Sequence, residues 1–167
     1  MAGTATNVTA GKPKTSGAVF SAPIGTTIPT DAITALDSMP GWDTMLGLQF
    51  ETLVLNNFHA LLPSLGLDRS NILSVGPYAR RGKRGEGCQV DILFQTEYLA
   101  YAVEVKRMKN IDLSVIDEMK AKLSRFPRRE NVTLRKALVY DGTLSPQVEE
   151  RGYFDALIPA RTLMTAS

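Results

Sequence analysis

Hydrophobic residues recur along this chain at two spacings, which separate the expected helices from the expected strands. Between residues 43 and 62 they return every three or four positions, the period of an amphipathic helix, and Pro63 should end that helix. Residues 89–95 and 99–107 are rich in β-branched and aromatic residues, and only three residues separate them. The two runs therefore predict a β-hairpin.

The remaining hydrophobic runs continue the alternation of helix and strand. They predict a strand over 72–78, an amphipathic helix over 112–125, a strand over 135–140 closed by an Asp141-Gly142 turn, a short helix near 146–150 and a strand near 156–159. On the second long helix, Lys120, Lys122 and Arg125 are expected to face outward. The order helix, three strands, helix, strand predicts one α/β domain over residues 41–167.

The first 40 residues differ in composition from the rest of the chain. Thr, Ala, Gly, Ser and Pro dominate, charged residues are scarce, and neither a helical nor a strand period is visible. Such a segment has too little apolar surface to fold alone. Residues 1–40 are therefore expected to form a flexible or extended arm.

Length and composition limit the class of protein. With 167 residues, 44% of them hydrophobic, the chain can build one core. It contains no apolar run of about 18 residues and no signal-peptide layout, so we expect a protein that is not exported and does not bind membranes. Cys88 and His59 are the only residues of their types, which excludes an internal disulfide framework and zinc sites rich in Cys or His.

Charge is distributed unevenly, although the formal net charge is only +2. Residues 1–68 hold two basic and five acidic residues, whereas residues 69–136 hold fifteen basic and eight acidic residues. The basic excess concentrates in the loop 80–84 and in the stretch 106–136. One interpretation is a polyanionic partner such as nucleic acid. The other is a solvated basic surface that binds nothing.

Asp91, Glu104 and Lys106 carry the clearest chemistry. Antiparallel pairing around the three-residue turn sets Asp91 opposite Glu104 or one position away, at a Cβ separation of about 4.5 to 8 Å. Strand alternation puts Glu104 and Lys106 on one face. Two carboxylates this close repel each other unless a cation lies between them. Oxygen ligands favour Mg²⁺ or Mn²⁺, held by Asp91 and Glu104; the alternative is a surface ion pair of little energetic weight.

The order of elements, Asp91 and the Glu104-Val105-Lys106 triplet together resemble the PD-(D/E)XK nuclease superfamily, although Val90 replaces the proline of the motif. A more specific resemblance, over residues 42–164, is to the nuclease-like C-terminal domain of a group of prokaryotic AAA+ ATPases. The segments that carry it are Trp42, 50–51, 53–57, 76–78, 87–91, 103–107, 138–142 and 152–155. The resemblance implies a restriction-endonuclease-like core, a mixed β-sheet flanked by helices.

The given sequence contains no G-x-x-x-x-G-K-[ST] phosphate loop, so an ATPase module is expected as a partner. A second resemblance covers the arm. Segments 1–14, 21–25 and 29–37 are similar to the start of the major tail-tube proteins of long-tailed bacteriophages. This likeness ends near Ser38 and indicates a fused or transplanted leader rather than a tail function. A phage tail protein is a further candidate partner.

The nuclease resemblance implies a role for each candidate residue. Asp91 and Glu104 would hold the metal ion, and Lys106 would orient the attacking water or offset the growing negative charge. Glu51 would add a carboxylate from the first helix. Gln89, expected on the same strand face as Asp91, would support the site. The residues expected to contact phosphates are Arg80, Arg81, Lys83, Arg84, Arg107, Lys120 and Lys122.

These observations predict a Mg²⁺- or Mn²⁺-dependent nuclease or nuclease-like domain that acts on DNA. The expected location is the cytoplasm of a prokaryote, or a phage particle. The alternative function is a non-catalytic module that binds nucleic acid or belongs to a phage tail. The oligomeric state is open, with a homodimer among the options.

Overall fold

The computed structural model describes residues 39–82, 86–127 and 129–165. All but the last two residues of the predicted arm over 1–40 lie outside the described residues. Among the described residues, no helix is long and apolar enough to cross a lipid bilayer.

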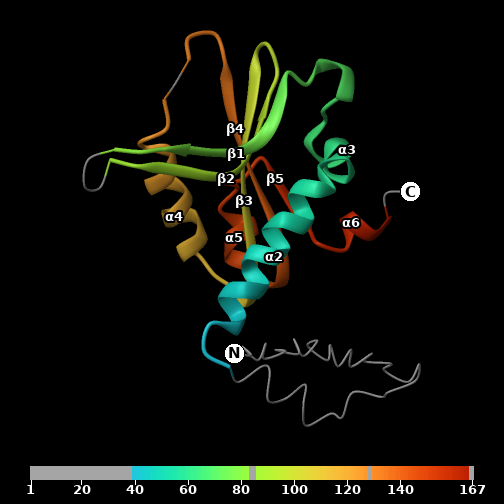
Figure 1. Ribbon diagram of the computed structural model, residues 1–167, viewed down its shortest axis with the longest axis vertical. Helices are drawn as coiled ribbons and strands as arrows, with labels where there is room; N and C mark the ends of the chain where they lie inside the picture. The colour runs from blue at the N-terminus through green and yellow to red at the C-terminus, as the bar shows by residue number, and fades with distance from the viewer. Residues whose placement is uncertain (1–38, 83–85, 128, 166–167) are drawn as a thin grey trace, which may run out of the picture.

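One mixed sheet of five strands forms the centre of the fold, and the strands lie side by side in sequence order (Figure 1). They are β1 (Ser74–Arg80), β2 (Cys88–Gln95), β3 (Leu99–Ile111), β4 (Thr133–Leu144) and β5 (Ala156–Pro159). β2 is antiparallel to both of its neighbours, β1 and β3, whereas β4 runs parallel to β3 and β5 runs parallel to β4. A parallel step needs a crossover, and α4 (Ser114–Leu123) provides it between β3 and β4. The predicted α/β class is confirmed.

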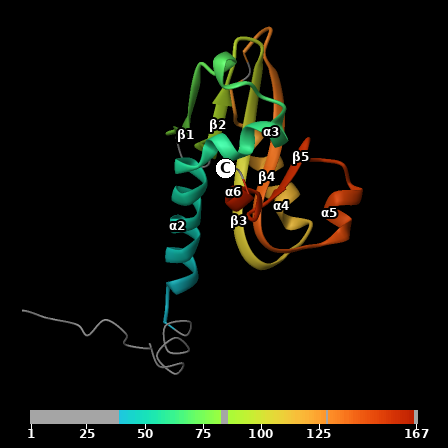
Figure 2. The ribbon, with the colours of Figure 1, turned by 90° about the vertical axis from the view of Figure 1, so that its right-hand side faces the viewer.

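Helices cover both faces of the sheet (Figure 2). α2 (Trp42–Asn56) and α3 (Leu62–Leu65) lie on one face, and α4 and α5 (Pro146–Glu150) lie on the other. Strand alternation divides the apolar core between the two faces. On β3, for example, Val103 packs in the core under α2, while Ala102 packs in the core under α4.

The first helix is shorter than predicted. α2 ends at Asn56, and the chain continues through the 3₁₀ helix η1 (Phe58–Leu61) into α3. Pro63 lies in the first turn of α3 instead of ending a helix, at a position where its fixed φ and missing N–H are tolerated. The remaining short elements are η2 (Arg69–Asn71) and α6 (Thr162–Thr165).

Gly142 does not form the predicted turn, because β4 continues through it to Leu144. The register between β3 and β4 shifts after Arg107, and Gly142 lies where the two backbones approach each other. Its φ is +136°, and a Cβ added there would lie 1.7 Å from the carbonyl oxygen of Met108. Glycine is therefore required at this bulge for both its conformation and its lack of a side chain.

Candidate active site where two strands diverge

β2 and β3 pair over only part of their length. The pairing begins beside the turn, at Gln95 and Ala100, and its last pair is Ile92 with Val103. Beyond that pair, β2 stays beside β1 while β3 continues beside β4, so the two strands diverge (Figure 1). We call this place the fork. The predicted hairpin is confirmed.

A bulge in β2 marks the start of the fork. Gly76 of β1 pairs with Leu93 and Tyr78 pairs with Val90, so that Pro77 alone stands opposite two residues, Asp91 and Ile92. Proline suits this position because it has no N–H to donate to a ladder. The extra residue in β2 changes which way the following side chains point.

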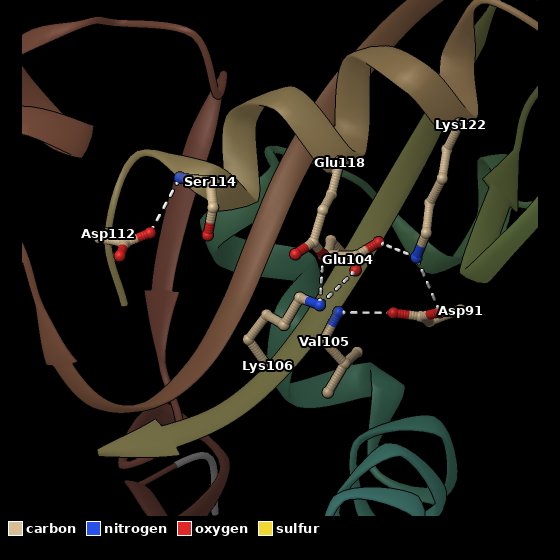
Figure 3. A network of polar contacts seen from close by, with 8 residues as sticks. All are labelled: Asp91, Glu104, Val105, Lys106, Asp112, Ser114, Glu118 and Lys122. Carbon is tan, nitrogen blue, oxygen red and sulfur yellow. Dashed lines mark hydrogen bonds and ion pairs between the residues drawn. The ribbon is translucent and has the colours of Figure 1, made fainter. Parts of the chain in front are cut away.

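The Asp91 carboxylate fills the gap that the diverging strands leave. Its Oδ2 accepts a hydrogen bond of 2.9 Å from the backbone N–H of Val105 on β3 (Figure 3). Within the paired half of the hairpin a strand carbonyl would take that proton. The carboxylate is therefore part of the sheet's hydrogen bonding, and its side chain is only 7% exposed.

Glu104 follows the last paired residue of β3 and is almost fully buried, with 2% of its side chain exposed. Lys106 lies on the same strand face, and its Nζ is 3.3 Å from Glu104 Oε1. The predicted shared face of these two residues is confirmed. The Nζ of Lys106 is also 2.6 Å from Oε2 of Glu118, on α4.

Lys122 lies inside the cluster, contrary to the prediction that it faces outward from α4 (Figure 3). Its Nζ is 2.5 Å from Glu104 Oε2 and 3.6 Å from Asp91 Oδ1. The prediction assumed that a lysine on an amphipathic helix prefers solvent, but two buried carboxylates supply a stronger electrostatic partner. One ammonium thus bridges the two carboxylates.

Sequence reasoning missed Glu118 altogether, and it predicted Lys122 only as a phosphate contact and not as a partner of the two carboxylates. Glu118 and Lys122 stand four positions apart on α4, the spacing that places two side chains on one face of a helix. The signal was available, because a helix that connects two parallel strands must cross a face of their sheet. Glu104 and Lys106 of β3 lie on the face that α4 covers.

The charges of the cluster shift the pKa values of its members. Burial, followed by the charge of Asp91, raises the pKa of Glu104. Burial alone would lower the pKa of Lys122, but its hydrogen bond to Glu104 and the charges of both carboxylates raise it. Lys106 behaves likewise, since Glu118 and Glu104 outweigh its burial and raise its pKa. Both lysines therefore stay positively charged at neutral pH.

Glu51 joins the cluster electrostatically from α2, as the predicted helical carboxylate. It is half-buried. Burial and the nearby charges of Asp91 and Glu104 raise its pKa. Because the strands diverge here, the pair of carboxylates interacts with charged groups from both helical layers.

Gln89 does not share a face with Asp91, so that prediction was wrong. Cys88 and Val90, on either side of Gln89, both pack in the core under α4, and Gln89 is exposed. Strict alternation would then turn Asp91 away from α4, yet Asp91 contacts Lys122 of that helix. The bulge after Val90 breaks the alternation on which the prediction depended.

Among the described basic residues predicted to bind phosphate, only Lys122 lies at the fork. Arg80 donates a 2.9 Å hydrogen bond to the carbonyl of Arg125, and Arg107 pairs with Asp141 at 3.4 Å. Arg81 is exposed. Lys120 pairs with Asp117 at 3.4 Å, and Lys83 and Arg84 lie outside the described residues.

The donor set at the fork fits a divalent ion that keeps most of its water ligands. Asp91 and Glu104 each direct one carboxylate oxygen toward the same position. The Lys122 ammonium occupies that position, where a metal ion would bind. Mg²⁺ binds readily through one or two carboxylates plus waters. In the part of the chain that the structure describes, no group of three or more His, Cys, Asp or Glu side chains is arranged to hold a metal.

Comparisons with known proteins add no relative. The chain matches no family model, no curated protein and no solved structure.

Proposed function

We propose that this protein is a metal-dependent nuclease or nuclease-like domain that hydrolyses phosphodiester bonds in DNA, built on a restriction-endonuclease-like core. The observation that carries the proposal is the convergence of Asp91 and Glu104 on one cation position, with Lys106 beside them. A five-stranded mixed sheet flanked by helices, with the divergence of two strands at the site, supports it.

Asp91 and Glu104 would hold Mg²⁺ or Mn²⁺. When bound, such an ion polarises a phosphoryl oxygen and lowers the pKa of water. Lys106 keeps its positive charge beside them and would offset negative charge that develops on the phosphoryl group. Glu118 holds the Lys106 ammonium in place, and Glu51 would offer a further carboxylate from α2.

Lys122 has to leave its present position before a metal ion can take it. Two positive charges cannot share one point between the carboxylates, because their repulsion would exceed the attraction that holds either. The lysine side chain is 28% exposed, so its ammonium can move toward solvent and become a contact for phosphate.

The position of Lys122 also favours a second candidate function. A cation already bridges Asp91 and Glu104, so the site is electrostatically complete without metal. A non-catalytic module that binds nucleic acid, or acts with an ATPase module or a phage tail protein, would keep this arrangement permanently.

A plasmid-nicking assay in Mg²⁺ or Mn²⁺ separates the two functions. The wild type should nick the plasmid, and the Asp91→Asn variant should nick it at least a hundredfold more slowly. The substitution removes a charged metal ligand, but the asparagine side chain can still accept the hydrogen bond from the Val105 N–H. Asp117→Asn is the matched control, because Asp117 is an exposed carboxylate outside the cluster. Binding of DNA without nicking would favour the non-catalytic module, and equal nicking by Asp91→Asn would overturn the nuclease proposal.

A further inference from the structure

A cavity of about 640 Å³ lies under the C-terminal half of α4, between the sheet and the chain that leaves the helix. Its lining includes three aromatic rings and three cations: Tyr78, Phe126, Tyr153, Lys120, Arg129 and Lys136. None of the acidic residues of the fork lines it. It is therefore separate from the fork, and of its lining residues only Lys120 is also an expected phosphate contact.

Aromatic and aliphatic side chains form about half of the cavity wall. Tyr78 and Phe126 meet edge to face, with ring centroids 5.0 Å apart, which fixes two of its walls. Leu123 and Leu134 add aliphatic surface. Its volume is within the range of about 300 to 1,000 Å³ that is usual for small-molecule sites.

Two lysines flank the ring of Tyr153. The Nζ of Lys136 is 5.0 Å from the ring centroid, and that of Lys120 is 5.6 Å away. Each also pairs with one carboxylate, Lys136 with Asp155 at 3.6 Å and Lys120 with Asp117 at 3.4 Å. An ammonium has three protons to donate, so each lysine can bind a further anion without losing its present partner.

We propose that this cavity binds a small organic anion with a planar apolar body, which lies against the aromatic walls while its charged group contacts Lys136 and Lys120. Nucleoside monophosphates and aromatic carboxylates share this chemistry. Aromatic walls accept a flat ring, and a charge-assisted hydrogen bond to an ammonium is about twice as strong as a neutral one. The proposal does not depend on the function of the fork.

Fluorescence titration with 8-anilinonaphthalene-1-sulfonate, a planar aromatic anion, tests the proposal on the full chain. We expect one saturable site per chain. Lys136→Met should weaken binding about tenfold, the loss of one charge-assisted contact. The backbone N–H of Lys136 donates to Asp155 at 2.8 Å, so the variant leaves that carboxylate held. Lys109→Met removes an exposed lysine outside the cavity and should bind as the wild type does.

A second pair of variants tests the volume of the cavity without changing its charge: one variant fills the cavity, and the other is its control. Ser124 is exposed and lines the cavity, so Ser124→Phe should place a ring inside it and weaken binding at least tenfold. Ser64→Phe adds the same ring at an exposed position on α3 and should change nothing. Circular dichroism establishes that each variant is folded.

Competition experiments identify the chemical class of the anion. Displacement of the probe by adenosine monophosphate, or by 1-naphthoate, supports the proposal and tells a nucleotide from an aromatic carboxylate. Adenosine, which lacks the charge, should displace the probe at least tenfold less well than its monophosphate. Failure of both anions to compete, or equal binding by Lys136→Met and Lys109→Met, would overturn the proposal.

Discussion

The two halves of the β2–β3 hairpin differ in what lies between the strands and in how the backbone is hydrogen-bonded. In the paired half, Phe94 and Tyr101 are buried in an apolar core and the strands satisfy each other's backbone. In the forked half, Asp91 and Glu104 are buried instead, and a side chain takes over a backbone hydrogen bond. A bulge opposite Pro77 separates the halves. The inserted residue thus marks the boundary between an apolar sheet interior and a charged site.

The buried charge in the forked half has a structural as well as a chemical role. Without the Asp91 carboxylate, the Val105 N–H would be a buried donor with no acceptor, at a cost of about 1 to 3 kcal/mol. The same carboxylate belongs to the pair that needs a cation. The two roles can be separated only by substitutions that keep the hydrogen bond to Val105 and remove the negative charge of Asp91, or that remove both.

The largest effect should come from the paired half. Phe94→Ala removes a fully buried ring and should lower the free energy of unfolding by about 3 to 5 kcal/mol, measured by urea denaturation. Gln89→Ala, on the same strand but exposed, should change it by less than about 0.5 kcal/mol. Comparable losses from both variants would mean that the paired half is not the stable part of the hairpin.

Two substitutions of Asp91 separate its structural role from its charge. Asp91→Ala removes the acceptor for the Val105 N–H and should cost about 1 to 3 kcal/mol of unfolding free energy. Asp91→Asn keeps an oxygen that can accept this hydrogen bond, and should cost less. Equal destabilisation by the two variants would show that the charge, not the hydrogen bond, holds the fork together.

Substitutions of Lys122 and Lys120 test whether the position of a lysine on α4 determines its contribution to stability. Lys122→Met removes the ammonium that bridges two buried carboxylates and should cost about 1 kcal/mol in metal-free buffer, a value reduced by the partial exposure of Lys122. Lys120→Met removes an exposed ion pair and should cost close to nothing. Thermal denaturation of both variants gives the comparison, and identical melting temperatures would contradict it.

The pH dependence of stability should reveal Glu104. Its pKa is raised in the folded state, so its contribution to stability is complete below the unfolded pKa and is lost as pH rises through the folded pKa. Lowering the pH from above neutrality toward the ordinary pKa of a glutamic acid should therefore stabilise the wild type relative to Glu104→Gln. If the difference in unfolding free energy between the two proteins does not change as the pH falls, the raised pKa is contradicted.

Much of the fold could be predicted from the sequence because periodic patterns decide it. The hairpin, the position of α5 and the shared face of Glu104 and Lys106 follow from spacing alone. Deviations from regular spacing could not be predicted. The bulge after Val90 depends on tertiary pairing with Pro77, and its effect on Gln89 leaves no local signature.

The error about Lys122 has a different physical origin. Amphipathic patterning assigns every lysine to solvent, and on α4 that is correct for Lys120. Lys122 is drawn inward by carboxylates on β2 and β3, which lie 18 or more residues away in sequence. Only the three-dimensional arrangement shows that the cation inferred between Asp91 and Glu104 is supplied, in this state, by the chain itself.

Isothermal titration calorimetry with Mn²⁺ shows whether Asp91 and Glu104 form a metal site. We expect one ion per chain in the wild type, at least tenfold tighter binding in Lys122→Met, in which the competing ammonium is absent, and no binding in Asp91→Asn. Absence of binding in both the wild type and Lys122→Met, or unchanged binding in Asp91→Asn, would contradict a metal site at the fork.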